Sequence, residues 1–201
     1  MMIVDRINRA TRKIPAWLIY IVGSLWAAWL FWLGLTGGLG PEPINALERE
    51  YGSMALQLLV AGLCITPLRR YAGLNLIKYR RALGVTAFFF VLAHLTVWMV
   101  LDVQSLSRVW EDILKRPYVT IGMAGFVLLI PLAMTSNNMS VRRMGAQWRS
   151  LHKLTYPAVL LGSIHFIWLV KGWPIEPFAY LGAIVLLFSV RLDAIQRMSR
   201  G

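Results

Sequence analysis

The chain has 201 residues, of which 58% are hydrophobic and 15% charged, and its formal net charge is +12. Soluble domains are about 45–50% apolar and about 25% charged, so this composition excludes a soluble enzyme and a disordered chain. The single cysteine, Cys64, excludes a disulfide scaffold and an iron–sulfur set, and it lies in an apolar run where packing is its expected role. The composition predicts an all-α, polytopic membrane protein.

Six apolar stretches follow one another along the chain, and each has about 14–22 residues, where a bilayer crossing needs about 20. We predict that they form a six-helix transmembrane bundle within residues 15–192. A basic segment, 1–14, precedes the bundle and a short tail, 193–201, follows it. The first stretch is long enough to be an uncleaved spanning helix. The predicted spans are 15–36, 51–68, 83–101, 118–135, 151–170 and 177–190.

Charged residues divide between the two sides of these spans. One side has sixteen basic residues with only Asp5 and Asp193 as acids, and the other has five basic residues and seven acids. The net charge is thus +14 on the first side and −2 on the second, and by the positive-inside rule this predicts that both termini are cytoplasmic. No basic block is interleaved with aromatic residues on a soluble module, so we expect no nucleic-acid partner. The seven acids are Glu42, Glu48, Glu50, Asp102, Glu111, Asp112 and Glu176.

All three histidines lie in or at the edge of an apolar span, where a polar ring costs free energy and tends to mark function. His94 follows Arg81 at the same separation at which His165 follows His152. At 1.5 Å per residue, both therefore lie about 20 Å from the inner end of their helices. Two imidazoles at one depth suit the iron of a six-coordinate b-type haem, with one ligand on each face. The alternative is a hydrogen bond between helices with no cofactor.

The role of His152 stays open. On an ideal helix it points about 140° away from His165, although Pro157 between them can kink and rewind the helix. No fourth histidine completes a pair at its depth, because Arg80 and Arg81 occupy the matching place on the third span. These arginines could bind haem propionates or a phosphate, or could be a topology signal alone.

Two segments carry a resemblance to a known family: PLRRYAGLNLIKYRRALGVTAFFFVLAHL (67–95) and WRSLHKLTYPAVLLGSIHFIWLVK (148–171). They resemble MsrQ, the haem-binding membrane subunits of periplasmic protein-methionine-sulfoxide reductase systems, within the wider ferric-reductase and NADPH-oxidase transmembrane group. The most specific part is one histidine on the third span together with two histidines, at positions 152 and 165, on the fifth. The chain departs from the wider group at Arg81, which stands in place of an inner histidine, and this puts a conventional second haem in doubt.

The resemblance implies a ferric-reductase-like transmembrane domain in a bacterial inner membrane, with haem b and FMN as cofactors. It implies His94 and His165 as the outer iron ligands and His152 as the inner histidine of the family pattern. By the same likeness, the subunit would form a heterodimer with a periplasmic molybdopterin catalytic subunit of the MsrP type. It would pass electrons to that subunit from the quinone pool or a cytoplasmic flavin reductase, for repair of oxidised periplasmic proteins.

The residues themselves favour electron transfer without bond-making chemistry on a substrate. The chain has no GxGxxG after a strand, no P-loop and no Ser–His–Asp candidate, so it would depend on an external electron donor. The alternative is a proton- or metal-linked transporter that uses the three histidines. The lack of Asp and Glu in the predicted spans counts against that alternative, since carboxylates are the usual relay groups of such proteins.

Overall fold

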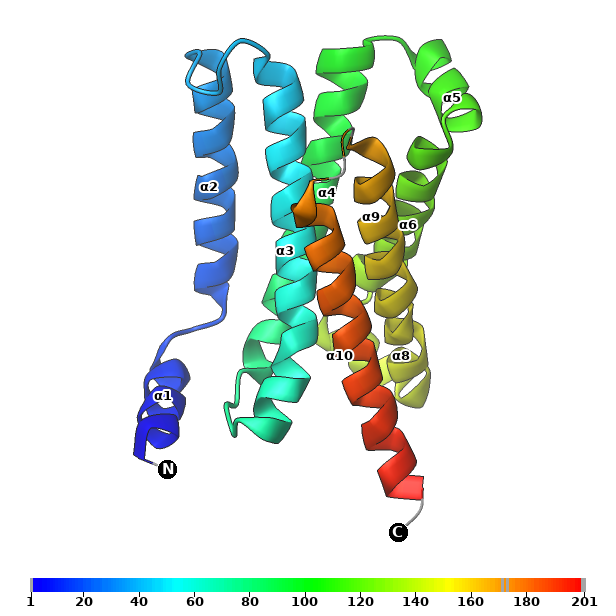
Figure 1. The fold of residues 1–201 in the computed structure, drawn as a ribbon. Coiled ribbons are helices and arrows are strands. Elements are labelled where there is room, and N and C mark those ends of the chain that lie inside the picture. The colour runs from blue at the N-terminus through cyan, green and yellow to red at the C-terminus, as the bar shows by residue number, and fades with distance from the viewer. Residues whose placement is uncertain (1, 171, 173, 200–201) are drawn as a thin grey trace.

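The computed structural model describes residues 2–170, 172 and 174–199, with side chains up to Arg191 (Figure 1). All regular elements in these residues are helices. The side chains of the predicted tail 193–201, and residues 200–201 altogether, lie outside the described part. Within the described residues, four helical segments are long and apolar enough to cross a membrane: α2 (Trp17–Leu35), α3 (Pro43–Tyr71), Ile77–Val103 and α6 (Pro117–Met134).

Helices occur at all six predicted ranges. The segment Ile77–Val103 consists of a 3₁₀ turn, α4 (Arg80–Val97) and a π-helical end, Trp98–Val103. The fifth and sixth ranges hold α9 (Thr155–Leu169) and α10 (Ile175–Ser199). α9 has only 15 residues because the chain turns in 3₁₀ geometry at His152–Leu154 and is extended at Val170.

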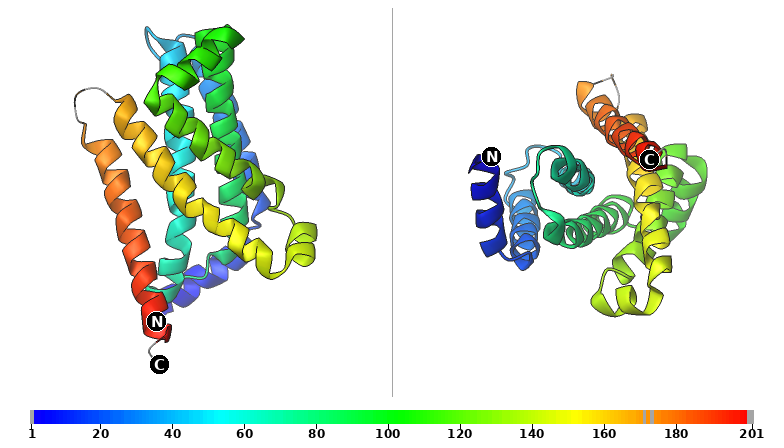
Figure 2. Two further views of the ribbon diagram at one scale, coloured as in Figure 1. Left: turned by 90° about the vertical axis from the view of Figure 1, so that its right-hand side faces the viewer. Right: turned by 90° about the horizontal axis from the view of Figure 1, so that it is seen from below.

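The helices pack as two main pairs, α3 with α4 and α6 with α9 (Figures 1 and 2). α10 lies against α3 and α9, and α2 stands at the edge of the bundle against α3 and α4. The pairs meet around buried Leu63, Ala87, Val159 and Ile184. In α2 only Leu30 is buried, as expected for a helix whose apolar surface faces lipid.

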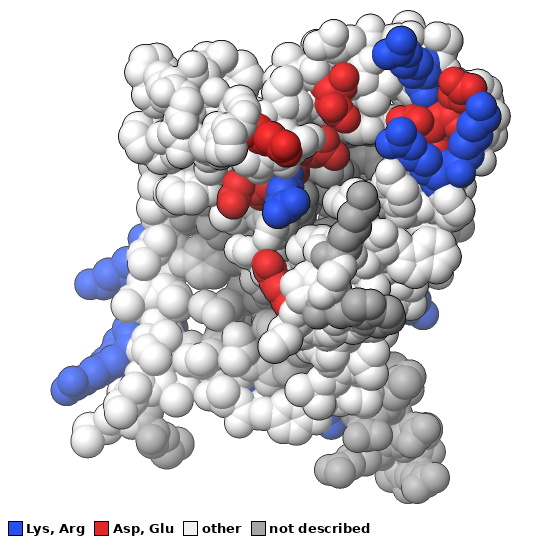
Figure 3. Space-filling model, turned by 45° about the horizontal axis from the view of Figure 1, so that its top comes forward, with Lys and Arg blue, Asp and Glu red and all other residues white. Residues whose placement is uncertain are grey.

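α3 begins at Pro43, well before the predicted start of the span at Tyr51, because proline suits the first turn of a helix. Glu48 and Glu50, which precede the predicted span, are therefore helical. α1 and the end of α10 lie at one end of the molecule, and we name the opposite end the outer end (Figure 1). Acidic side chains gather toward the outer end, where α3 begins (Figure 3).

The structure contains two substantial helices that the sequence analysis did not predict. The first is α1 (Met2–Lys13), which is tied to the α3–α4 connection. The Asn8 side chain donates to the Gly73 carbonyl at 3.0 Å and accepts from the Asn75 amide at 2.9 Å. The predicted N-terminal segment is thus an ordered amphipathic helix.

The second is α5 (Leu106–Lys115), between α4 and α6 at the outer end. Val109 packs against Trp98 and Val119, whereas Trp110 on the same helix is exposed. The Lys115 ammonium donates to the Glu111 carboxylate and holds the pKa of that carboxyl below its usual range. Two shorter helices, α7 (Asn138–Met144) and α8 (Ala146–Leu151), connect α6 to the 3₁₀ turn before α9.

Candidate functional site

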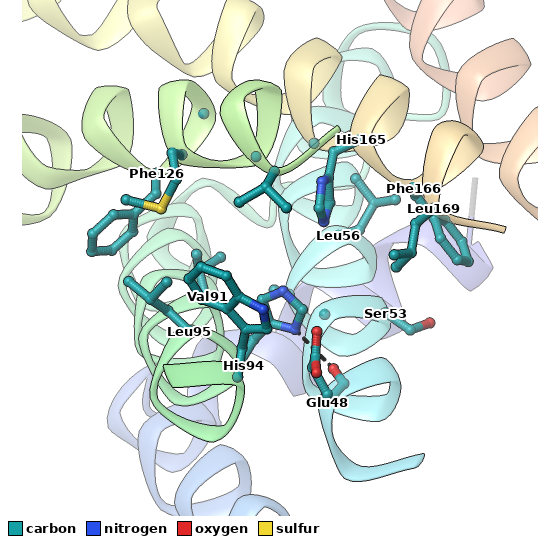
Figure 4. A pocket seen from close by; sticks show the side chains of 18 of the residues that line it. Glu48, Ser53, Leu56, Val91, His94, Leu95, Phe126, His165, Phe166 and Leu169 are labelled. Atoms are coloured by element: carbon teal, nitrogen blue, oxygen red, sulfur yellow. Dashed lines mark hydrogen bonds between the residues drawn. The ribbon is translucent and has the colours of Figure 1, made fainter. Parts of the chain in front are cut away.

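The structure brings His94 of α4 and His165 of α9 together. Their ring centroids are 6.2 Å apart and the ring planes cross at 79° (Figure 4). The two residues belong to different helix pairs, so each pair contributes one ring to the space between them. The equal depths that the sequence predicts for these histidines thus correspond to neighbouring rings.

Each ring is held by one hydrogen bond to a backbone carbonyl. His94 Nδ1 lies 2.9 Å from the Glu48 carbonyl oxygen, and His165 Nδ1 lies 2.7 Å from the Tyr118 carbonyl oxygen. Because a carbonyl oxygen can only accept, Nδ1 of each ring carries the hydrogen. Nε2 of each ring then keeps its lone pair, which is the form of histidine that binds a metal ion.

A glycine stands beside each ring, four residues after the accepting carbonyl. A Cβ atom at Gly52 would lie 3.2 Å from His94 Nδ1, and one at Gly122 would lie 2.8 Å from His165 Nδ1. Residues four apart share one face of a helix, so the carbonyl and the glycine present a single surface to the ring. The absence of a side chain at these positions lets the imidazole approach the helix backbone closely.

The rings face a pocket between α3, α4, α6 and α9. Its empty volume is about 1090 Å³, including its open side. Leu56, Val91, Phe126 and Leu129 give it apolar walls, and Glu48 lies near its outer end (Figure 4). Four glycines flatten those walls: Gly52, Gly122, Gly125 and Gly162. A flat, apolar ligand with a metal at its centre matches this lining.

The distance between the rings fits a haem iron with two axial histidines. An imidazole nitrogen binds a transition-metal ion at about 2 Å and its ring centre lies roughly 1 Å further, so two rings on opposite sides of one ion have centroids about 6 Å apart. The observed separation is 6.2 Å. The donor set also fits, because both Nδ1 atoms are engaged and neither Nε2 atom is bonded to another described residue.

His152 lies outside this pocket, in the 3₁₀ turn before α9. Its Nε2 is 3.0 Å from the Thr135 hydroxyl, and its ring stacks on Trp148 with centroids 3.9 Å apart. Pro157 therefore does not place His152 and His165 in a common pocket. His152 instead has its own polar and aromatic surroundings toward the inner end.

Two arginines lie near this second histidine, and a third lies near one of them. Arg81 donates to the Asn138 side-chain oxygen at 2.7 Å, and the charges of Arg80 and Arg81 act on His152. Arg191 of α10, which the sequence analysis did not select, donates to the Leu63 carbonyl at 2.8 Å. Among the described side chains, none of the three arginines is paired with a carboxylate. The described side chains of the inner end thus present positive charge without a fixed counter-ion.

The two carbonyls and the two glycines beside the histidines were missed by sequence reasoning. One signal was available, because the two hydrogen bonds span nearly equal separations of 46 and 47 residues. Each hydrogen bond links a histidine to the outer part of the helix that packs against the helix carrying that histidine. A search for glycines 42 or 43 residues before each histidine would have selected Gly52 and Gly122.

Comparison with known proteins places the chain in a family. Residues 51–163, which include His94 and His152 and end two residues before His165, match the family described as "Ferric reductase like transmembrane component". A protein of Brucella anthropi is 48% identical over 177 residues, which cover 88% of this chain and 80% of the relative. Proteins of Brucella ovis and Brucella canis are 46% identical over the same shares. All three are named "Protein-methionine-sulfoxide reductase heme-binding subunit MsrQ".

The chain belongs to the MsrQ family. The resemblance predicted from the sequence is therefore confirmed. No solved structure shows a significant match. The apolar helices of the chain and the transmembrane family that it matches make this MsrQ relative a multi-pass membrane protein.

Proposed function

We propose that this MsrQ-family chain is an electron-transfer subunit in which His94 and His165 hold the iron of one b-type haem. The observation that carries the proposal is the pair of rings 6.2 Å apart, each with Nδ1 bonded to a backbone carbonyl. When bound, the haem supplies reversible one-electron reduction at its iron. The function of the chain is to hold this group between the two faces of the membrane.

The surroundings of the histidines set the properties of the site. The carbonyls of Glu48 and Tyr118 fix the tautomer and orientation of the rings, and they raise the basicity of Nε2. The apolar walls exclude water and favour a large flat hydrophobic group. None of these groups performs bond-making chemistry on a substrate, which is consistent with a relay.

The direction of electron transfer follows from the proposed topology. We propose six membrane crossings in a bacterial inner membrane, with both termini in the cytoplasm, since basic residues concentrate at the end that holds the termini. The histidine pair then lies toward the periplasm. Electrons would come from quinol or a cytoplasmic flavin reductase and pass to a periplasmic MsrP-type molybdopterin subunit, the partner in a heterodimer.

We propose a separate anion-binding role for the inner end. His152, Arg80 and Arg81 lie close together there without a carboxylate among the described side chains. Arginine favours phosphate and carboxylate groups, so the phosphate of FMN or haem propionates match this cluster. His152 would then contribute to a cofactor site distinct from that of His94 and His165.

Replacement of the histidines tests the ligand assignment. His94→Ala and His165→Ala should each lose the low-spin haem in reduced-minus-oxidised spectra, normalised to folded, membrane-inserted protein. Added imidazole should restore part of the spectrum by filling the space left by the ring, which shows that the variants are folded. His152→Ala is the matched control and should keep the low-spin haem. If His94→Ala keeps a full, unshifted spectrum while His152→Ala abolishes it, the assignment is wrong.

The same spectra address the transporter alternative. A dithionite-reduced α-band in the purified wild-type protein requires haem and belongs to the electron-transfer proposal alone. Purified protein that binds no haem and instead carries protons or metal ions across a vesicle membrane would support the transporter.

A further inference from the structure

The helix α1 lies across the inner end of the molecule rather than along the long helices of the bundle (Figure 2). The chain passes directly from α1 into α2, which is a candidate membrane span. Ile14 follows α1 and Trp17 begins α2, so at most about 11 Å of chain separates them. Trp17 is exposed at the start of a membrane helix, where tryptophan favours the interface between lipid and water. The position of α1 is therefore that of a helix at a membrane surface.

Hydrogen bonds to the α3–α4 connection fix the orientation of α1 about its own axis. Besides the two bonds of Asn8, the Lys78 ammonium donates to the Ile14 carbonyl at 2.7 Å. The Tyr79 hydroxyl donates to the Thr11 carbonyl at 2.7 Å. These two carbonyls lie in and just beyond the last turn of α1, where a helix supplies no partner of its own. Because of these bonds, α1 cannot turn its other sides toward the bundle.

An apolar stripe of α1 is left uncovered by the described part of the chain. Ile3, Ile7 and Ala10 recur at spacings of four and three residues, which places them on one side of the helix, and Ile14 continues the line. Ile3 is 73% exposed and Ile14 is 48% exposed, and the two residues between them are exposed as well. Isoleucine side chains gain free energy when they leave water, so an apolar medium is the favoured neighbour of this stripe.

A basic stripe runs beside the apolar one. Arg6, Arg9 and Lys13 each precede a member of the apolar stripe by one residue, so they lie about 100° around the helix from it. All three are exposed, and none is paired with a carboxylate among the described side chains. Long basic side chains can reach lipid headgroups while a neighbouring apolar stripe enters the leaflet. The phosphates of anionic lipids would supply the missing counter-charge.

We propose that α1 is an interfacial helix that binds anionic phospholipids of the leaflet at the inner end. The apolar stripe enters the acyl boundary, and Arg6, Arg9 and Lys13 bind lipid phosphates. Lipid is the occupant, rather than a second protein, because the short link to α2 and the bonds to the α3–α4 connection hold both stripes at the membrane surface. Tyr79 directly precedes Arg80, the first residue of α4, so bound lipid also steadies the start of that helix.

The test places an environment-sensitive fluorophore on α1 of the full chain in lipid nanodiscs. The label is attached at Ile7→Cys or at Asp5→Cys, which lies about 200° around the helix, and Cys64→Ser removes the native thiol. The label at position 7 should emit as in an apolar medium, and the label at position 5 as in water. Nitroxide-labelled phosphatidylglycerol should quench the label at position 7 about fivefold more strongly than equally labelled phosphatidylcholine, the effect of one basic residue near an anionic surface.

Removal of the basic stripe separates the contribution of the headgroups from that of the apolar stripe. Arg6→Gln, Arg9→Gln and Lys13→Gln in one chain should abolish the preference for phosphatidylglycerol. The apolar emission of the label at position 7 should remain, because the isoleucines are unchanged. Raised salt should reduce the preference of the unsubstituted stripe, since exposed charges are screened. Circular dichroism of each variant checks that α1 and the bundle stay helical.

The matched control removes three exposed arginines from α7 and α8 at the same end of the molecule, by Arg142→Gln, Arg143→Gln and Arg149→Gln. This variant loses the same charge but keeps the basic stripe, so it should keep the preference for phosphatidylglycerol near α1. Equal quenching by the two lipids with the stripe intact would overturn the proposal, and so would equal loss of preference in both triple variants. A label at position 7 that is in water, or that is shielded but quenched by neither lipid, would show that lipid does not cover α1.

Discussion

The glycine beside each histidine allows a quantitative test of how the rings are positioned. In Gly122→Ala the new methyl group would lie 2.8 Å from Nδ1 and 3.0 Å from Cε1 of His165, where ordinary contacts begin at 3.4 Å. Because α6 fixes the backbone, the ring has to retreat by about 0.6 Å to restore an ordinary contact with Nδ1. In Gly52→Ala the separation is 3.2 Å, so His94 retreats by only about 0.2 Å on the same criterion.

Such a retreat weakens the bond between His165 and the Tyr118 carbonyl and misdirects Nε2. A hydrogen bond of this kind contributes about 1 kcal/mol, and loss of a partner that orients a metal ligand typically lowers affinity about 10–100-fold. We expect Gly122→Ala to bind haem about tenfold more weakly and Gly52→Ala about threefold at most. Alanine is also the better helix former, by about 1 kcal/mol, so loss of folding is not the expected cause.

The assay is a titration of haem into the apo-protein, followed by the low-spin spectrum. Gly62→Ala is the matched control on α3, because nothing lies within 4 Å of a Cβ atom at that position. If Gly122→Ala takes up haem with the affinity and spectrum of Gly62→Ala, the glycine does not position the ring. The reasoning would also be refuted if Gly52→Ala were the more damaging substitution, since its contact is the looser one.

Three further predictions concern topology, partnership and stability. A cytoplasmic reporter fused to the C-terminus should be active and a periplasmic phosphatase silent, and the reverse pattern would invert the assigned orientation. If the chain is only a relay, an MsrP-type partner should still reduce methionine sulfoxide when this chain is absent and reduced viologen supplies the electrons. A partner that is inactive under those conditions would mean that the chain supplies more than electrons. Tyr51→Phe should lower the free energy of unfolding by about 1 kcal/mol, because the hydrogen bond to the Ala27 carbonyl is lost. Denaturant titration in detergent measures this change, and an unchanged free energy of unfolding would show that this bond does not hold α2.

Much of the fold followed from hydropathy and charge. Apolar stretches located helices at all six ranges, because a spanning helix must satisfy its backbone internally and present apolar side chains to lipid. The rise per residue was enough to place His94 and His165 at one depth. The α1 and α5 helices were missed because they are short and amphipathic, and a search for long apolar runs does not detect them.

The finer parts of the site could not be read from the sequence. The acceptors for His94 and His165 are main-chain carbonyls, which every residue has, so residue type does not identify them. The closeness of Gly122 to its histidine depends on how α6 packs on α9. The start of α3 at Pro43 was missed because its first turns carry charged residues and resemble a loop in hydropathy. The roles of His152, Arg80 and Arg81 stay predictions.

The division of the site between two helix pairs has a consequence for assembly. Each ring is already hydrogen-bonded to a carbonyl of the other helix in its pair. Each half of the site is therefore oriented before any cofactor arrives. A ligand that joins Nε2 of one half to Nε2 of the other would act as a cross-link between two preformed helix pairs. Cofactor insertion would then reinforce the contact between the pairs, and by mass action the loaded protein would resist unfolding more strongly as free haem rises.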